Sequence, residues 1–368
     1  MYKLKDFAQD ISVAIKDAQS SPFDRFVGLE HYDSGEPVIT RYTDKSLLSS
    51  SVKEFRKNDI LIARRNVYLK RAGIAFFDGL TSGDSIVLRI YDDCESRTGI
   101  SKQDAIRIIP FILNSNVFWA YANKHADGMN SKRISKEMLY DYEFDLPPLA
   151  EQKVLAEKLW AAYRLKESYK KLLAATEEMV KSQFIEMTGD PRTNPKGWPV
   201  KTLPELATYS IGLTYKPENI SEEGTIVLRS GNIQKSKIDL ADVVRVNCPI
   251  KESIYVQKND ILMCSRNGSA ALVGKVAMIK DIPEPMTYGA FMTVIRSEYS
   301  DYLYLYFQSN DFREQVSTGK SSTMNQITQN MLDKISLPLP DDETRKKLSI
   351  ILHQADKSGS VLQYMIAC

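Results

Sequence analysis

Short apolar segments alternate with polar breaks in both halves of the chain. Runs of β-branched and aromatic residues bounded by Gly, Pro, Asp or Asn are typical of strands, and such runs occupy residues 60–63, 73–77, 85–90, 261–264, 274–279 and 291–295. Helical spacing of apolar residues predicts short helices that cover a sheet, at residues 106–114, 118–121, 302–307 and 312–316. The pattern therefore predicts an α+β globule of about 145 residues in each half, which is an ordinary domain size.

A long uninterrupted helix is expected between the two halves. From Leu149 to about Met187 the chain has no Gly or Pro, whereas Pro148 precedes this segment and Gly189 follows it. Apolar or small residues recur about every 3.5 residues, which is the period of a coiled coil. The stripe that we expect to dock another helix or a partner consists of Leu155, Leu159, Ala162, Leu165, Tyr169, Leu172 and Met179. We interpret the segment as a spacer between two domains; the alternative is a long helix packed within one domain.

A second helical stripe lies near the end of the sequence. Leu348, Leu352 and Ala355 have the spacing of one helix face and are assigned to the same docking role. The Ser-Gly-Ser segment at residues 358–360 is expected to interrupt this helix, because these residue types are weaker helix formers. The second helix should therefore be markedly shorter than the first.

Two blocks of the sequence occur twice in the same order. The string KNDIL occupies residues 57–61 and again 258–262, and an Arg-Asn pair follows it each time, at 65–66 and 266–267. Farther on, each half has a Leu-Pro element followed by acidic, basic and then helical residues. Short matches arise by chance, but a shared order of blocks predicts two duplicated domains.

Composition places the chain among soluble globular proteins, with 43% hydrophobic and 26% charged residues. Its 368 residues suit two domains of moderate size. No membrane association is expected, because no apolar run is long enough to span a bilayer and the first residues lack the apolar core of a signal peptide. The four cysteines have neither metal nor disulfide spacing, so a cytoplasmic location is expected.

The formal net charge is only +2, but basic residues gather locally. Between Lys53 and Arg71, seven Lys or Arg residues stand against two acids, and a local basic face can hold DNA phosphates. Arg can bond guanine and Asn can bond adenine through paired contacts. The DNA-contact candidates of the first half are Arg64, Arg65, Asn66, Lys70, Arg71, Lys124, Lys132 and Arg133. Those of the second half are Arg266, Asn267, Ser269, Lys275, Lys320, Ser321, Ser322, Thr323 and Asn325. Taken singly, each is equally compatible with an ordinary surface position.

Motifs for catalysis lack the spacing that each chemistry requires. Residues 319–321 (Gly-Lys-Ser) resemble the end of a phosphate-binding loop, but Glu314 stands where its first glycine is needed. Asp341 and Glu343 are too close together for a nuclease site and open a predicted helix, where acids suit the dipole. The three histidines show neither metal nor nucleophile spacing. We therefore expect no catalytic residues and no metal site on this chain.

The Leu-Pro elements and the helix after the first of them resemble a known family. Residues 146–153 (LPPLAEQK), running into a helix that ends in residues 182–191 (SQFIEMTGDP), resemble the central conserved region of type I restriction–modification specificity (S) subunits. Residues 337–347 resemble the start of the distal conserved region of that family. The resemblance implies an α+β fold with two pseudo-symmetric target-recognition domains separated by long antiparallel coiled-coil helices. The implied divisions are target-recognition domain 1 at 1–145, a central conserved helical spacer at 146–190, target-recognition domain 2 at 191–336 and a short distal conserved helical region at 337–368.

The resemblance also implies a function. A specificity subunit is not itself an enzyme: it reads a bipartite, asymmetric target in double-stranded DNA and docks two methyltransferase (M) subunits and the restriction (R) subunits. It implies no cofactor on this chain, S-adenosylmethionine on the M subunit, and ATP and Mg²⁺ on the R subunit. Self-association through the helices is a further expectation. Two alternatives stay open, a fused DNA methyltransferase or nuclease with an unrecognised motif and a coiled-coil scaffold with no DNA role.

Overall fold

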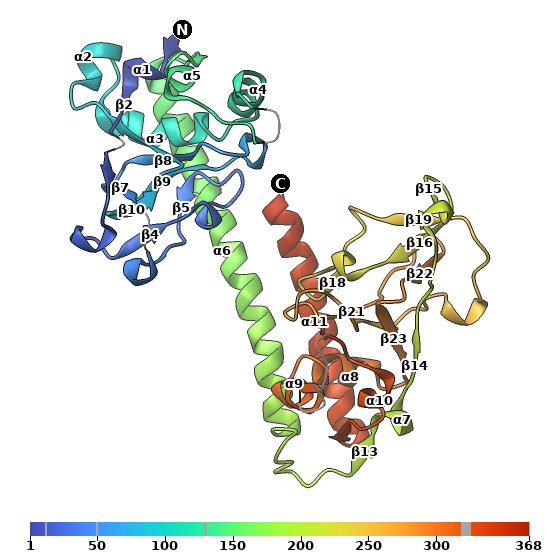
Figure 1. Ribbon diagram of the computed structural model, residues 1–368. Coiled ribbons are helices and arrows are strands. Elements are labelled where there is room, and N and C mark those ends of the chain that lie inside the picture. The colour runs from blue at the N-terminus through green and yellow to red at the C-terminus, as the bar shows by residue number, and fades with distance from the viewer. Residues whose placement is uncertain (12, 49–50, 129–130, 318–324, 368) are drawn as a thin grey trace. The chain divides into compact units, whose positions relative to one another are not determined.

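The structure is a computed structural model that describes residues 1–11, 13–48, 51–128, 131–317 and 325–367. The chain divides into two compact units, Met1–Leu165 (unit 1) and Lys166–Cys368 (unit 2), whose elements are labelled in Figure 1. Each unit combines small β-sheets with short helices, so the α+β fold class predicted from the sequence is confirmed. No helix in these described ranges is long and apolar enough to cross a membrane.

Unit 1 is built on two five-stranded sheets. The first has the order β3 (Ala14–Ile15), β7 (Val52–Phe55), β10 (Gly79–Ser82), β4 (Arg25–Val27), β6 (Thr43–Asp44). The second has the order β2 (Ala8–Asp10), β11 (Ser85–Ile90), β8 (Ile60–Ala63), β9 (Ala72–Ala75), β5 (Val38–Ile39). In β8, Ile62 belongs to the core under the helices and Leu61 to another core shared with the first sheet. Both faces of this strand are buried, which explains why its sequence is continuously apolar.

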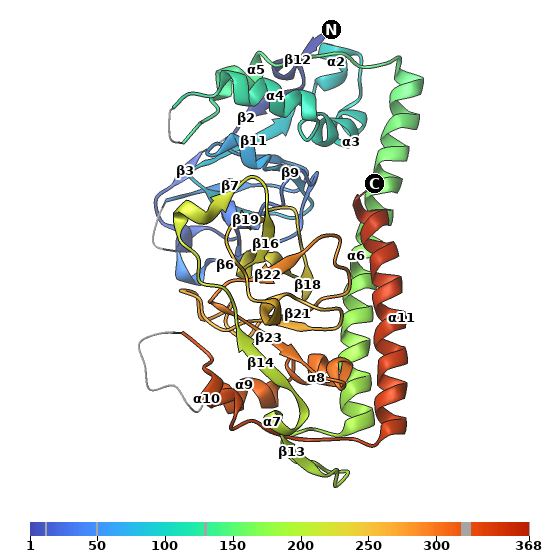
Figure 2. The same ribbon diagram turned by 90° about the vertical axis from the view of Figure 1, so that its right-hand side faces the viewer.

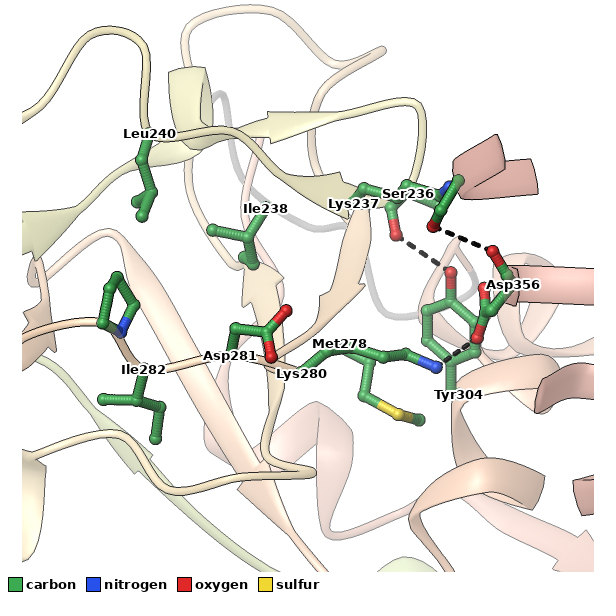
Figure 3. A pocket seen from close by; sticks show the side chains of 12 residues that line it. Ser236, Lys237, Ile238, Leu240, Met278, Lys280, Asp281, Ile282, Tyr304 and Asp356 are labelled. Atoms are coloured by element: carbon green, nitrogen blue, oxygen red, sulfur yellow. Dashed lines mark hydrogen bonds and ion pairs between the residues drawn. The ribbon is translucent and has the colours of Figure 1, made fainter. Parts of the chain in front are cut away.

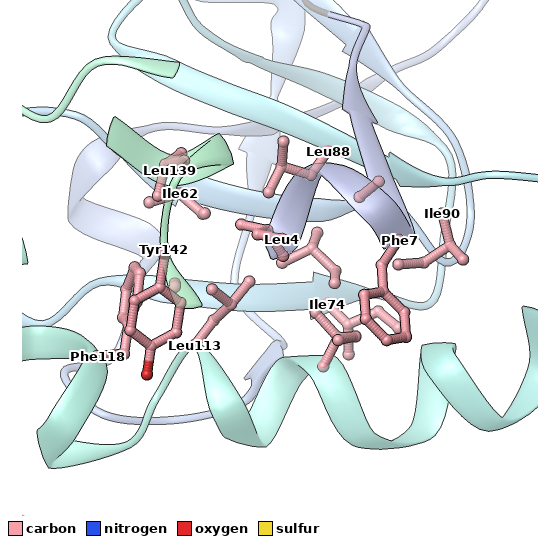
Figure 4. Packing of buried hydrophobic residues seen from close by; sticks show 14 of the residues in the cluster. Leu4, Phe7, Ile62, Ile74, Leu88, Ile90, Leu113, Phe118, Leu139 and Tyr142 are labelled. Atoms are coloured by element: carbon pink, nitrogen blue, oxygen red, sulfur yellow. The ribbon is translucent and has the colours of Figure 1, made fainter. Parts of the chain in front are cut away.

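Short helices cover the second sheet of unit 1. They are α1 (Leu4–Phe7), α2 (Cys94–Thr98), α3 (Lys102–Ile112), α4 (Asn116–His125) and α5 (Lys136–Tyr140), with a two-stranded pair of β1 (Tyr2–Lys3) and β12 (Glu143–Phe144). Ser101, Ser115 and Ser135 cap α3, α4 and α5 by accepting backbone N–H groups of the first turn. Figure 4 shows the core between helices and sheet, where Phe7 and Leu88 are fully buried. The helices predicted at 106–114 and 118–121 are α3 and α4.

Unit 2 repeats this plan with shorter sheets. One sheet has the order β14 (Thr208–Ile211), β23 (Met292–Arg296), β20 (Ile261–Cys264), β21 (Val276–Met278), and the other β15 (Ile220–Ser221), β19 (Val244–Val246), β16 (Thr225–Leu228), β22 (Met286–Tyr288). The two-stranded pairs are β13 (Val200–Thr202) with β24 (Ser336–Pro338) and β17 (Ile233–Gln234) with β18 (Lys237–Ile238). The short helices are α7 (Leu203–Leu206), α8 (Ser300–Tyr306), α9 (Asn310–Ser317) and α10 (Gln329–Leu332).

The duplicated KNDIL string has one structural role in both units. Its aspartate is buried at the start of a central strand, Asp59 before β8 and Asp260 before β20. Arg89 donates two hydrogen bonds to Asp59, each 2.7 Å long, from the adjacent strand β11. Arg296 of β23 donates two to Asp260, at 2.8 and 2.7 Å. This shared ion pair, in sheets of matching order, confirms the internal repeat.

The long helix predicted from residue 149 is present as α6 (Leu149–Thr188). Its first part belongs to unit 1, where Ala156 is buried in the core and Trp160 packs against it. The Trp160 indole N–H donates to the carbonyl of Arg107 in α3, at 2.9 Å. Residues 166–188 of the same helix belong to unit 2.

In unit 2 the second part of α6 packs against α11 (Asp342–Ala367), and Figure 2 shows the two helices side by side. Leu173 lies beside Gly359, whereas Phe184, later in α6, shares a core with Leu348, earlier in α11. The reversed order of these contacts shows that the two helices are antiparallel, as expected.

The expected interruption of the second helix at residues 358–360 is wrong. Helix α11 continues through the Ser-Gly-Ser segment and spans 26 residues, fewer than the 40 of α6. Gly359 is buried, and a Cβ atom there would lie 3.4 Å from the Leu173 side chain, so packing favours a small residue. The Ser360 hydroxyl donates to the Asp356 carbonyl at 2.9 Å, which satisfies it within the helix.

Candidate nucleic-acid interface

The first candidate site is the turn between β8 and β9 of unit 1. Two of its residues have left-handed backbones, Asn66 with φ 53° and Lys70 with φ 50°, and the 3-10 helix η4 (Val67–Leu69) lies between them. Val67 is buried and anchors the turn, whereas Tyr68 is 62% exposed. The turn therefore presents a protruding surface among the basic residues that the sequence singled out.

A second segment, just before α5, is hydrogen-bonded to this turn. The Asn66 N–H donates to the Lys132 carbonyl at 2.9 Å, and the Ile134 N–H donates to the Arg64 carbonyl at 3.0 Å. The Ser131 hydroxyl also donates to the Asn66 side-chain oxygen at 3.3 Å. These bonds bring together candidates from two parts of the sequence that are far apart.

Some of the predicted cations already have protein partners. The Arg65 Nε atom lies 2.9 Å from a carboxylate oxygen of Asp84, and the backbone of Arg65 pairs with that of Arg133. The Arg71 guanidinium donates to the carbonyls of Leu29, at 3.0 Å, and of Arg65, at 2.9 Å. Arg65 and Arg71 therefore help to shape the turn itself.

The lysine candidates of unit 1 gather around α4. Lys70 donates to the Asn116 side-chain oxygen at 3.0 Å, and Lys132 donates to the Asn123 carbonyl at 3.1 Å. Lys124, the next residue on α4, is exposed. The ammonium groups of Lys70 and Lys132 thus lie against α4, and Lys124 is exposed on the same helix.

Lys53 belongs to the same basic run of the sequence, but its ammonium group is bound within the domain. Its ammonium donates to the carbonyl of Ser85. Burial lowers the pKa of Lys53, and the nearby Arg64 charge adds to this effect. A high count of cations in a segment therefore overstates the positive charge that the surface presents.

Unit 2 has the same two backbone hydrogen bonds at the equivalent residues. The Asn267 N–H donates to the Asn325 carbonyl at 3.3 Å, and the Ile327 N–H donates to the Ser265 carbonyl at 2.7 Å. These two bonds match those that Asn66 and Ile134 make in unit 1. The Arg-Asn pair of each repeat thus occupies one structural position.

The side chains of the unit 2 loop differ from those of unit 1. The Arg266 guanidinium lies 5.1 Å from the ring centroid of Phe291, an aromatic residue that is 58% exposed. The Asn267 side chain donates to the Ser230 hydroxyl at 3.0 Å and accepts from the Ser269 N–H at 2.9 Å. This loop carries Arg266 among small neutral residues, where the loop of unit 1 carries several cations.

The remaining candidates of unit 2 are less closely placed. Lys275 is half-buried, and its carbonyl accepts the Cys264 N–H at 2.9 Å. The Asn325 side chain donates to the Gly268 carbonyl at 3.2 Å, so it adjoins the loop. The candidates outside the described residues are Lys320, Ser321, Ser322 and Thr323.

A third segment of each site was missed from the sequence. It is the turn after β4 in unit 1, with η2 (Leu29–His31), and the turn after β16 in unit 2, with η6 (Ser230–Asn232). Leu29 accepts from Arg71, and Ser230 accepts from Asn267. The letters of these turns, GLEH and RSGN, do not resemble each other, so only the fold reveals that they correspond.

The docking stripe predicted on the helices is mostly exposed on α6 and packed into the core of unit 2 on α11. On α6, exposed fractions are 40% for Leu155, 52% for Leu165, 53% for Leu172 and 48% for Met179. The other predicted members are exposed at Ala162 and partly buried at Leu159 and Tyr169. On α11, Leu348 and Leu352 are buried in the core of unit 2 and Ala355 packs against it.

A cavity of about 560 Å³ lies in unit 2 (Figure 3). Ion-paired Lys280 and Asp356 form part of its lining, and Tyr304 donates to the Ser236 carbonyl at 2.9 Å. The Tyr304 bond ties the β17–β18 turn to α8, and the Lys280–Asp356 pair ties the segment after β21 to α11. Across the part of the chain that the structure describes, no group of three or more His, Cys, Asp or Glu side chains could hold a metal ion.

Comparison with known proteins finds a family model that matches the second half of the chain. Residues 195–362 match the model of the type I restriction modification DNA specificity domain. The specificity subunit of the type I restriction enzyme EcoKI from Escherichia coli (strain K12) is 29% identical over 177 residues, which is 45% of this chain and 38% of that protein. The StySPI specificity subunit from Salmonella potsdam is 29% identical over 182 residues, 46% of this chain and 39% of that protein. The chain thus spans about two fifths of the length of these curated relatives.

Solved structures share the fold along the chain. The S subunit of a type I restriction–modification system from M. genitalium has a TM-score of 0.53 at 13% identity, covering 100% of this chain and 91% of that one. A chain from a structural study of complex assembly and conformational transition in a type I R-M system has a TM-score of 0.52 at 17% identity, covering 100% and 93%. At these identities the likeness concerns the fold alone. Residues 195–362 are thus similar to the type I restriction modification DNA specificity domain, and the chain shares the fold of these solved structures.

Proposed function

We propose that the chain is the DNA-reading, non-catalytic subunit of a type I restriction–modification enzyme, and that each unit reads one half of a bipartite, asymmetric target. In this proposal the target-recognition domains are residues 1–145 and 191–336, and the helical regions are 146–190 and 337–368. The observation that carries the proposal is the duplicated Arg-Asn loop, fastened by the same two backbone hydrogen bonds in both units. The names of the curated relatives support it.

Within each loop, base reading falls to the arginine and asparagine side chains. Arginine bonds guanine through two acceptors in the major groove, and asparagine bonds adenine through a donor and an acceptor. Asn66 and Asn267 occupy equivalent positions, and Phe291 supports the flat Arg266 guanidinium. The lysines around α4 of unit 1 would contact phosphates, which fix the register of a protein on DNA.

In this proposal, partner subunits catalyse the methylation and cleavage reactions. Two M subunits dock on the exposed apolar residues of α6, and R subunits join the complex. S-adenosylmethionine belongs to the M subunit, and ATP and Mg²⁺ belong to the R subunit. Self-association through the helices and a cytoplasmic location complete the proposal.

The test combines the purified chain with its M subunit, S-adenosylmethionine and plasmid DNA, followed by sequencing of methylated bases. The expected result is methylation within one two-part motif, and none with either protein alone. Asn66→Ala should relax one half of the motif, and Asn267→Ala should relax the other. Loss of discrimination against a wrong base of about 1–3 kcal/mol is typical of one paired contact.

Other outcomes would contradict the proposal in distinct ways. Methylation or cleavage by the chain alone would make it an enzyme. A complex that forms with the M subunit but has no salt-dependent affinity for DNA would make it a scaffold, because phosphate-driven binding weakens as salt rises.

A further inference from the structure

His31 stands in unit 1 where unit 2 has Asn232. The strands that precede them correspond, since β4 pairs in parallel with β10 and β16 in parallel with β22. The Gly28 N–H donates to His31 Nδ1 at 2.9 Å, and the Arg229 N–H donates to the Asn232 side-chain oxygen at 2.9 Å. Both side chains therefore close the same turn through the same backbone bond.

Each of these turns touches the Arg-Asn loop of its own unit. In unit 1 the Leu29 carbonyl accepts from Arg71, whose guanidinium also donates to the Arg65 carbonyl. In unit 2 the Ser230 hydroxyl accepts from Asn267. A change in the turn is thus passed to the loop through one hydrogen-bonded link.

The two closing residues differ in one chemical respect. A histidine nitrogen accepts a hydrogen bond only while it is unprotonated, and a proton on Nδ1 of His31 would face the Gly28 N–H. The imidazole is 8% exposed, with Phe26 packed edge-on against it, so water cannot readily replace the lost acceptor. The Asn232 amide does not titrate, and it also donates to the carbonyls of Asp239 and Asp242.

We infer that His31 is a positioning residue of the first DNA-contact loop, which it holds in place only while Nδ1 is unprotonated, so that acid loosens the loop of unit 1 and leaves that of unit 2 intact. The inference rests on the proposed function. It gives the two halves of the target different pH responses, because the hold of His31 requires an unprotonated Nδ1 and the Asn232 amide has no such requirement.

Charged and titratable groups lie close to the imidazole of His31. The Glu30 carboxylate lies 3.8 Å from Nε2, and the Arg71 guanidinium donates to the neighbouring carbonyl of Leu29. Burial raises the pKa of Tyr32 to about 12, so its phenol stays neutral throughout. Neither charge restores the acceptor that the Gly28 N–H loses.

Amide hydrogen exchange of the full chain tests the switch directly. Peptides covering residues 26–33 and 227–234 are compared at about pH 8 and about pH 5.5, after correction for the intrinsic exchange rate. At the lower pH, protection in the first peptide should fall about tenfold, the scale of one lost hydrogen bond. The second peptide should keep its protection. His31→Asn, which installs the residue of the other repeat, should make the first peptide behave like the second.

Binding to a random-sequence duplex of about 40 base pairs, measured by fluorescence anisotropy, links the switch to DNA. Acidification should weaken DNA binding by the wild-type chain more than DNA binding by His31→Asn. The variant keeps His125 and His353, so the comparison of the two proteins cancels the effect of those histidines. Equal protection of the first peptide at both pH values, or the same pH response in both proteins, would overturn the inference and leave the proposed function standing. If neither protein binds DNA even with the M subunit present, the proposed function fails and the role of His31 in this loop fails with it.

Discussion

At the scale of single residues, the KNDIL repeat marks a backbone requirement as well as an ion pair. Asn58 and Asn259 have left-handed backbones, with φ 73° and 68°, a conformation that asparagine tolerates better than most residues. The aspartate that follows then accepts from the backbone N–H three residues earlier and from an arginine of the neighbouring strand. This demand for particular residues explains why the string survives in two repeats whose loops have diverged.

Asp59→Asn should lower the free energy of unfolding by about 2–3 kcal/mol, because an amide cannot accept from Arg89 and from the Arg56 N–H as a carboxylate does. Denaturation in urea measures the change. Asp92→Asn is the matched control, since that carboxylate is 97% exposed in its ion pair, and it should leave stability unchanged. Equal effects of the two substitutions would show that burial of Asp59 contributes nothing.

At the scale of elements, α11 shows how packing overrides a residue's intrinsic preference. Gly359 is a weak helix former in isolation, yet it lies in a continuous helix whose face packs against α6. Propensity is a small term beside the burial of an apolar helix face, so one glycine does not end the helix.

Gly359→Ala should raise the free energy of unfolding by about 0.5–1 kcal/mol, because alanine loses less backbone entropy in a helix. The added Cβ would lie 3.4 Å from Leu173, an ordinary van der Waals contact. Thermal and urea unfolding measure the gain. Ser358→Ala, at an exposed position of the same helix, should give a smaller gain from propensity alone. Destabilisation by Gly359→Ala would mean that the two helices approach more closely than this.

The elements that could be predicted are those whose bounds are determined by the local sequence. Strands β8, β11 and β20 have the predicted bounds, because short apolar runs are cut off sharply by polar residues. The turns closed by His31 and Asn232 could not be predicted, since each depends on a strand pairing and their letters differ. The DNA-contact candidates of both loops remain a prediction, although hydrogen bonds bring most of those in unit 1 together.

At the scale of the whole molecule, α6 contributes to both compact units through one continuous helix. Its buried positions include Ala156 in unit 1, and Leu173 and Val180 in unit 2. The predicted stripe lies one residue earlier, at Leu155, Leu172 and their neighbours. Apolar residues stand next to each other at these positions of α6, so two neighbouring stripes of the helix are both apolar. The spacing in the sequence alone therefore cannot select the stripe that packs. The buried register stabilises the chain, and the exposed one is the surface that we propose for binding the M subunit.

This division predicts that neighbouring leucines of α6 have different roles. Leu172→Glu and Met179→Glu should each weaken binding of the M subunit by at least about tenfold, because a charge would enter an apolar interface. Both side chains are about half exposed, so thermal unfolding of the chain should not change. Leu173→Glu should instead unfold unit 2, since that side chain is 9% exposed. Ala174→Glu adds the same charge at an exposed position on another face and should preserve both properties. Full affinity of the Leu172 and Met179 variants, measured by titration calorimetry, would place the docking surface elsewhere.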